Sequence, residues 1–276
     1  CKETIIMLVV KKYSYLVLIL ILFVQNLLGQ SSKGKEFWMG FMDGGGEEIS
    51  LVIFSEVDTK GVISIPKQNW DTTFSVSANN FSEVFFKKNQ VMPVGSEKIH
   101  NKGIHISSED SITVYSRNWS NAWADWCLLY PIEFLGLNYS VLTHAEKGDN
   151  TSVENGDLSE FTVVATEDSS EIEISPSVET LGGYPPNSRF VVKLDKGELY
   201  QVQSKGNLTG STISTLSCCK RIAVFSGSPC TNVNNKTCCC DHLYEQILPN
   251  NLTGDEFVVI PFTDNSVPNT LIRIKK

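Results

Sequence analysis

The sequence predicts an all-β protein of tandem homologous units, each a β-sandwich of roughly 100 residues. Short segments rich in β-branched and aromatic residues recur along the 276-residue chain, separated by turn residues. Three stretches also open alike, at residues 34–37 (GKEF), 136–139 (GLNY) and 254–257 (GDEF). The alternative arrangement closes the units into one propeller-like or barrel-like assembly.

Matching segments follow in the same order after the first two openings. Residues 51–56 (LVIFSE) correspond to 162–167 (TVVATE), and 62–65 (VISI) correspond to 171–174 (EIEI). Both stretches then close on a similar strand, at 112–116 (ITVYS) and at 222–226 (IAVFS). A repeat of this kind sets the architecture before any single segment is interpreted.

The repeat predicts three units after a leader. Unit 1 covers residues 30–130, and unit 2 covers 131–250 and contains a Cys-rich loop. Residues 251–276 are interpreted as the start of a truncated unit 3, so the chain is expected to be a fragment of a longer protein.

Residues 1–29 are predicted to be a leader and signal peptide. Met7 is the first plausible initiator, and two lysines and an apolar core at 15–24 follow it. The apolar run is shorter than the ~20 residues that a membrane span needs. We therefore expect cleavage near Gly29, secretion and no span in the mature protein, with a retained anchor helix as the alternative.

Charge and motifs exclude several classes of function. The chain holds 31 acidic and 23 basic residues, a net charge of −8. An acidic, evenly mixed surface argues against binding to nucleic acid or to anionic membranes. The sequence contains no nucleophile elbow, phosphate loop or dinucleotide fingerprint. We predict a protein that is not an enzyme and has no catalytic residue, cofactor or metal.

Cysteine usage predicts disulfides. Seven of the eight cysteines follow the leader, and six of them fall within 23 residues. In a secreted chain this crowding indicates disulfides, and the odd number leaves one thiol free or paired with another chain, as in a disulfide-linked oligomer. Cys127 stands alone, and the clustered cysteines are Cys218, Cys219, Cys230, Cys238, Cys239 and Cys240.

Seven Asn-x-Ser/Thr sequons favour a secreted glycoprotein. They begin at Asn80, Asn118, Asn138, Asn150, Asn207, Asn235 and Asn251.

Two segments receive a local interpretation. Residues 119–126 (WSNAWADW) contain three tryptophans. We interpret them as a linker that packs its rings between the units, with an aromatic platform for sugar rings or a protein as the alternative. Residues 241–248 are expected to form a short helix with Asp241 as its N-cap.

Three groups of polar residues offer chemistry. Zinc at 238–242 (CCCDH) is disfavoured because adjacent cysteines do not readily close on one ion. Carboxylates at 56, 167 and 168 offer calcium ligands, although a tight turn explains them as well. A general acid–base site can be built from Asp241, His242 and Glu245, but we expect these residues to be structural.

The order of the motifs resembles the N-terminal domain family of immunoglobulin G Fc-binding proteins. The resemblance covers residues 33–276, and its most specific part joins 230–233 (CTNV) to 240–246 (CDHLYEQ). The other motifs are 34–38 (GKEFW), 101–107 (NKGIHIS), 112–115 (ITVY), 164–168 (VATED), 196–201 (KGELYQ), 208–211 (LTGS) and 222–227 (IAVFSG).

The resemblance implies a binding or adhesion module of a larger mucus-associated or defence-related glycoprotein. Its expected partner is an extracellular protein or glycoprotein, and antibody Fc only where the organism has antibodies. The alternatives are a disulfide-cross-linked matrix component and, less favoured, a hydrolase. Asp241, His242, Glu245 and Gln246 correspond to the family motif.

The resemblance also implies a Cys230–Cys240 bridge. The single cysteine that the family has before Asp-His is replaced here by three, and the Cys218-Cys219 pair is additional. We therefore expect Cys218 or Cys219 to join Cys238 or Cys239.

Overall fold

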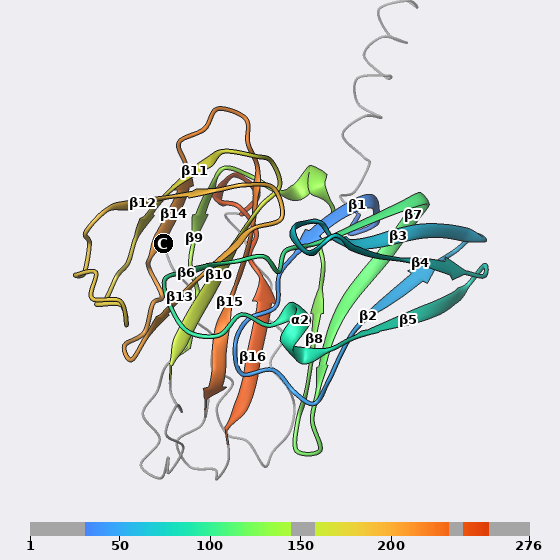
Figure 1. Cartoon of the computed structure of the whole chain (residues 1–276), viewed down its shortest axis with the longest axis horizontal. Coiled ribbons are helices and arrows are strands. Elements are labelled where there is room, and N and C mark those ends of the chain that lie inside the picture. The colour runs from blue at the N-terminus through green and yellow to red at the C-terminus, as the bar shows by residue number, and fades with distance from the viewer. Residues whose placement is uncertain (1–30, 145–157, 232–239, 254–276) are drawn as a thin grey trace, which may run out of the picture. The chain divides into compact units, whose positions relative to one another are not determined.

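The computed structural model describes residues 31–144, 158–231 and 240–253, and these are all-β, as predicted. The described residues from Lys33 onward form one compact unit. No helix in the described ranges is long and apolar enough to cross a membrane. The strands (Figure 1) are β1 (Gly34–Met39), β2 (Glu48–Ser55), β3 (Thr59–Ile65), β4 (Trp70–Val76), β5 (Asn80–Phe86), β6 (Lys98–His100), β7 (Ile104–Trp119), β8 (Ala124–Leu128), β9 (Asn138–Ser140), β10 (Ser159–Ala165), β11 (Ser170–Ser175), β12 (Phe190–Leu194), β13 (Leu199–Ser204), β14 (Thr212–Thr215), β15 (Ile222–Thr231) and β16 (Asp241–Gln246). Short helices are η2 (Pro66–Gln68), α2 (Lys88–Val91), η3 (Ile132–Phe134) and η4 (Asn250–Leu252).

The 16-residue strand β7 organises the first half of the fold. Its first part pairs with β1 and β3, and its second part pairs with β2 and β8. Strands β4 and β5 extend the two sides through β3 and β2. The two halves of β7 thus belong to two sheet layers, β4-β3-β7-β1 and β5-β2-β7-β8, which share the first hydrophobic core.

The second half of the chain repeats this order of pairing. Strand β14 pairs with β9 and β11, and β15 pairs with β10 and β16, as the two parts of β7 do with their neighbours. Strands β12 and β13 again extend the sides. Strand β6, from the first half, adds to β13. The sheets β16-β15-β10-β13-β6 and β12-β11-β14-β9 enclose the second core. A division into tandem domains stays a prediction, since one sheet takes strands from both halves.

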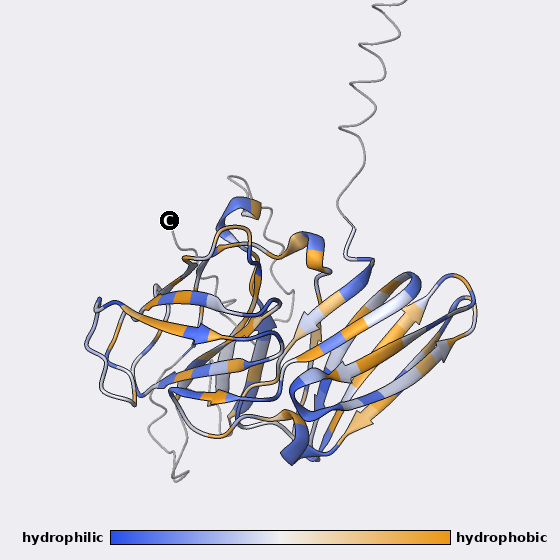
Figure 2. Ribbon diagram, turned by 45° about the horizontal axis from the view of Figure 1, so that its top comes forward, coloured by the Kyte–Doolittle hydropathy of each residue, from blue (hydrophilic) through white to orange (hydrophobic). Residues whose placement is uncertain are grey.

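The sheet β16-β15-β10-β13-β6 is buried on both faces at its centre. Every residue of β10 and β13 is buried. Alternate side chains along a strand point to opposite faces. Phe161, Val163 and Val202 therefore join the second core, while Val164 and Leu199 join the first. Hydrophobic and hydrophilic residues alternate along many of the strands (Figure 2).

The face toward the first core also carries buried polar side chains. Gln203 donates a hydrogen bond from Nε2 to Glu160 Oε2 at 2.8 Å. Gln201 accepts the Asp43 N–H at 3.0 Å and donates to the Gly95 carbonyl at 2.9 Å. Burial raises the pKa of Glu160 well above its ordinary value, and the charge of Asp43 adds to this. The sheet therefore contains a buried carboxyl group, and its charged form is disfavoured.

Two expectations about local structure are wrong. Residues 241–246 form strand β16, not a helix, because their backbone pairs with β15 from Phe225 to Thr231. Residues 119–126 are not a linker between units. They form the hairpin between β7 and β8, closed by a hydrogen bond from Ser120 N–H to the Trp123 carbonyl.

Replacing the buried carboxyl is expected to stabilise the protein at neutral pH. A raised folded-state pKa means that the stability contribution of Glu160 is present below its unfolded pKa and is lost as pH rises toward the folded value. A tenfold difference in proton affinity between the folded and unfolded states corresponds to about 1.4 kcal/mol of unfolding free energy. Thermal melts from pH 4.5 to 8 should show Glu160→Gln gaining stability relative to wild type as pH rises. The exposed Glu171→Gln is the control, and equal pH profiles for wild type and Glu160→Gln would contradict the account.

Candidate functional site

Strand β16 places the residues of the family motif on two opposite faces. His242, Tyr244 and Gln246 are buried, while Asp241 and Glu245 lie on the other, exposed face. A helix would have brought His242 and Glu245 together, but a strand with a period of two separates them. The structure therefore does not assemble an acid–base site from Asp241, His242 and Glu245.

His242 joins β16 to the β7–β8 hairpin. Its Nδ1 lies 3.1 Å from Asp125 Oδ2, and its side chain is fully buried. The imidazole also stacks on Trp123, with ring centroids 5.2 Å apart. The hydrogen bond orients the ring, and the stacked indole shields it from water.

Gln246 and Cys127 continue the same joint. The Gln246 side chain accepts the Tyr130 N–H at 2.7 Å, and Cys127 Sγ accepts the Gln246 N–H at 3.2 Å. Burial raises the pKa of the Cys127 thiol well above its ordinary value, which makes this thiol a poor nucleophile. Tyr244 donates to the Gly40 carbonyl at 2.9 Å. The inward half of the motif is thus a structural joint between the two halves of the fold.

The predicted disulfide between Cys230 and Cys240 is present and links β15 to the start of β16. Cys218 and Cys219 are free and exposed beside the other end of β15. A ten-residue strand separates its ends by about 30 Å. Cys238 and Cys239 lie outside the described residues, so the expected second bridge stays a prediction.

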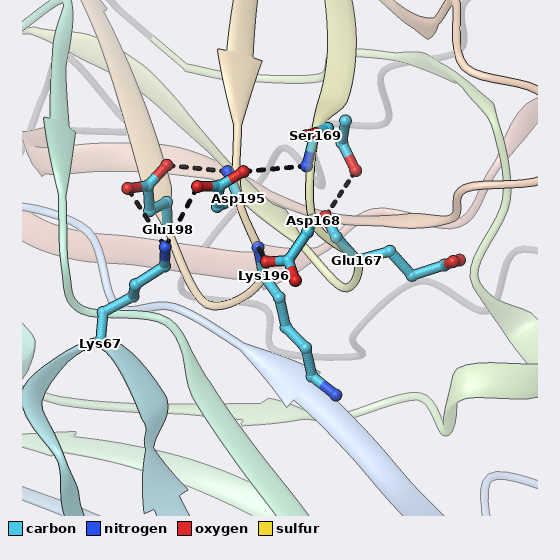
Figure 3. Close-up of polar contacts among 8 residues, drawn as sticks. Lys67, Glu167, Asp168, Ser169, Asp195, Lys196 and Glu198 are labelled. Carbon is cyan, nitrogen blue, oxygen red and sulfur yellow. Dashed lines mark hydrogen bonds and ion pairs between the residues drawn. The ribbon is translucent and has the colours of Figure 1, made fainter.

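Two of the three carboxylates considered for calcium, Asp168 and Glu56, have protein partners, and Figure 3 shows the turn around Asp168. Asp168 accepts the Lys196 N–H at 3.0 Å, and Asp195 accepts the Ser169 N–H at 2.9 Å, so two turns lock each other. Lys67 lies 3.4 Å from Asp195. Away from these turns, Glu56 pairs with Lys33. No group of three or more His, Cys, Asp or Glu within the described ranges is arranged to hold a metal ion.

The outer face of β5-β2-β7-β8 carries a row of aromatic side chains, here called the aromatic row. It consists of Phe81, Phe54, Tyr115 and Trp126, one from each strand. Neighbouring ring centroids are 5.6, 5.9 and 6.3 Å apart. Phe81 is 55% exposed and Trp126 is 48% exposed, so large apolar surfaces meet water on a sheet that is packed on its other side.

A fixed polar group flanks the aromatic row. Arg117 donates to Glu83 at 3.0 Å and to Glu48 at 3.2 Å, and Ser50 donates to Glu83 at 2.6 Å. Arg117 also lies over the Trp119 ring, 5.9 Å from its centroid. The face combines apolar rings with charges held in place by their neighbours, as binding surfaces commonly do.

Sequence reasoning identified only one end of this row. The tryptophan run contains Trp126, and the platform alternative included it. Trp123 instead packs on His242. One tryptophan of the hairpin therefore belongs to the structural joint, and Trp126 belongs to the aromatic row. The missed signal lies in β5, where Phe81, Glu83 and Phe85 follow one another at intervals of two residues. Residues at this interval in a strand share a face, so both exposed phenylalanines lie on the same face as Glu83.

The sequons differ in accessibility. Asn118 is buried, with 2% of its surface exposed, and Asn207 is half-buried, with Oδ1 accepting hydrogen bonds from Thr143 and Thr209. Asn80, Asn138 and Asn251 are exposed, whereas Asn150 and Asn235 lie outside the described residues.

Comparison with known proteins decides the family. The model of the IgGFc binding protein family matches residues 125–274, more than half of the chain. The chain belongs to this family. The IgGFc-binding protein of Homo sapiens is 30% identical over 212 residues, which cover 76% of this chain. The chain spans 4% of the length of that relative. No solved structure matches the chain.

The family match begins at Asp125, the residue that pairs with His242. Asp125 and His242, which pair in the structural joint, therefore both lie in the matched region. Of the aromatic row, only Trp126 lies within it.

Substitution at the joint should affect folding according to the face of β16. His242→Ala removes a buried ring, its stacking and its contact with Asp125, and should cost about 2–4 kcal/mol. Asp241→Ala, on the exposed face one residue earlier, should stay within about 0.5 kcal/mol of wild type. Urea unfolding measures both values, and equal effects of the two substitutions would contradict the joint.

Glycan occupancy should follow burial. Expressed in a eukaryotic secretory host, folded monomer should carry glycans at Asn80, Asn138 and Asn251, since these side chains reach solvent. Asn118 should be unmodified, because its amide lies inside the sheet. Glycopeptide mass spectrometry reports occupancy at each site, and full occupancy of Asn118 in folded monomer would refute the placement of β7.

Proposed function

We propose that this chain is an extracellular binding and adhesion module of a larger secreted glycoprotein, mucus-associated or defence-related. The aromatic row is the observation that supports a binding role. Exposed rings on a rigid sheet lose little conformational entropy when they bind, and aromatic residues are enriched among the positions that dominate interface energies. Family membership agrees with binding, since the human relative is named for its binding to IgG Fc.

The partner is an extracellular protein or glycoprotein that covers the outer face of β5-β2-β7-β8. The rings supply apolar contact, and Arg117 with Glu83 supplies polar contacts at fixed positions. Sugar rings of a glycoprotein stack on aromatic faces in the same way that apolar side chains do. Antibody Fc is the first ligand to test, and applies only where the source organism makes antibodies.

The alternative hydrolase finds no support in the geometry, because Asp241 and Glu245 point away from His242. A binding role needs no such assembly. It needs a rigid face, and the first core provides one behind the aromatic row.

Removing one ring should weaken binding without unfolding the protein. Trp126→Ala and Phe81→Ala should each reduce affinity about tenfold or more, the loss expected for a ring at the centre of an interface. Val191→Ala, which removes a side chain 54% exposed on β12, is the matched control and should leave affinity unchanged.

Binding of the chain to human IgG Fc and to purified mucin glycoprotein can be measured by surface plasmon resonance. An Asn80→Gln background removes the sequon beside Phe81, so that a glycan does not obscure the face. Binding that Trp126→Ala and Phe81→Ala leave unchanged would overturn the assignment of the face. If the chain binds neither ligand, the adhesion proposal is contradicted for these partners.

A further inference from the structure

The loop between β14 and β15 presents two adjacent cysteines to solvent. Cys218 and Cys219 are both exposed, and their Sγ atoms lie 3.2 Å apart. Cys219 has a φ of +67°, in the left-handed region that residues with a side chain seldom adopt. In a turn with this backbone conformation, the thiols of two consecutive residues lie close together.

The turn is fixed to the neighbouring turn between β10 and β11. Ser217 Oγ accepts the Glu171 N–H at 2.9 Å. Lys220 Nζ donates to the carbonyls of Asp168 and Ser169 at 2.8 and 3.0 Å. Residues on both sides of the pair are therefore anchored, and the thiols sit on a supported turn.

Other cysteines in the described ranges do not compete for this pair. Cys127 is buried on β8. The Cys230–Cys240 bridge lies at the far end of β15, about 30 Å away along the strand. In the described part of the molecule, each thiol of the pair has the other as its nearest sulfur.

We propose that Cys218 and Cys219 form a thiol–disulfide exchange site through which the module couples reversibly to a cysteine of another chain. The co-reactant is a disulfide on that chain. The thiolate of one cysteine of the pair attacks one sulfur of the disulfide, a new S–S bond joins the chains, and the second sulfur leaves as a thiolate that takes up a proton. Each exchange thus replaces one S–S bond by another.

The second thiol makes the coupling reversible. The other cysteine of the pair, once deprotonated, attacks the sulfur that holds the partner, which forms a Cys218–Cys219 disulfide and releases the partner as a thiol. Consecutive Cα atoms are about 3.8 Å apart, closer than the ~4.4 Å lower limit usual for disulfides, so this ring is strained and easily reopened by a thiol.

Oxidised glutathione is the probe for the exchange chemistry. It is added to the chain with Cys218 and Cys219 as thiols and the Cys230–Cys240 bridge intact, and to variants. All carry Cys238→Ser and Cys239→Ser, and the thiol of Cys127 is buried. The chain with both thiols should release two reduced glutathiones per molecule, lose two hydrogens and retain no adduct. Cys218→Ser and Cys219→Ser should each retain one glutathione. If the chain with both thiols retained two glutathiones, its two cysteines would react independently of each other, and the proposal would be overturned.

Coupling to a protein is tested with insulin as a disulfide-bearing chain. Cys218→Ser and Cys219→Ser each lack the second thiol, so each should trap a mixed disulfide on a non-reducing gel, whereas the chain with both thiols should release it. Trapping by neither variant, or equal trapping by the chain with both thiols, would overturn the proposal. Peptide mapping of the unmodified chain gives an independent check, because a bond from Cys218 or Cys219 to Cys238 or Cys239 would exclude a free exchange site.

Discussion

Burial of the sheet β16-β15-β10-β13-β6 on both faces is the constraint on which the rest of the structure depends. Its two faces contribute to two cores, so the halves of the fold share one layer. Such burial requires a partner for the polar groups on the shared side, since an unpaired buried group costs about 1–3 kcal/mol. Gln201, Gln203 and the Oε1 atom of Gln246 have such partners, whereas Gln246 Nε2 and Glu160 Oε1 are buried without one.

This requirement separates what the family motif does from what the surface does. The inward residues of β16 contact β8 and its flanking residues, and so they are committed to holding the fold together. Contacts with a ligand must therefore come from side chains that face away from both cores. The aromatic row meets that condition because β2 and β7 place it on the side of the sheet opposite the first core.

The sequence predicted the all-β class, because period-two patterns and turn residues are local signals. Strand β16 was misjudged because Asp241 resembles an N-cap and its inward residues are polar. Their partners lie far away in sequence, 117 residues between His242 and Asp125, and only the folded chain brings them together. The Cys230–Cys240 bridge was available from family resemblance alone. The aromatic row needed strand register, which sequence patterns leave open.

Hydrogen exchange measured by mass spectrometry across a denaturant series tests the shared sheet most directly. If one layer supports both cores, the amides of β10 and β13 should exchange only through global unfolding, and strands of both halves should lose protection in one transition. Two separate transitions, with β2 and β7 exchanging while β10 stays protected, would contradict the account, because the halves would then be independent domains that merely touch.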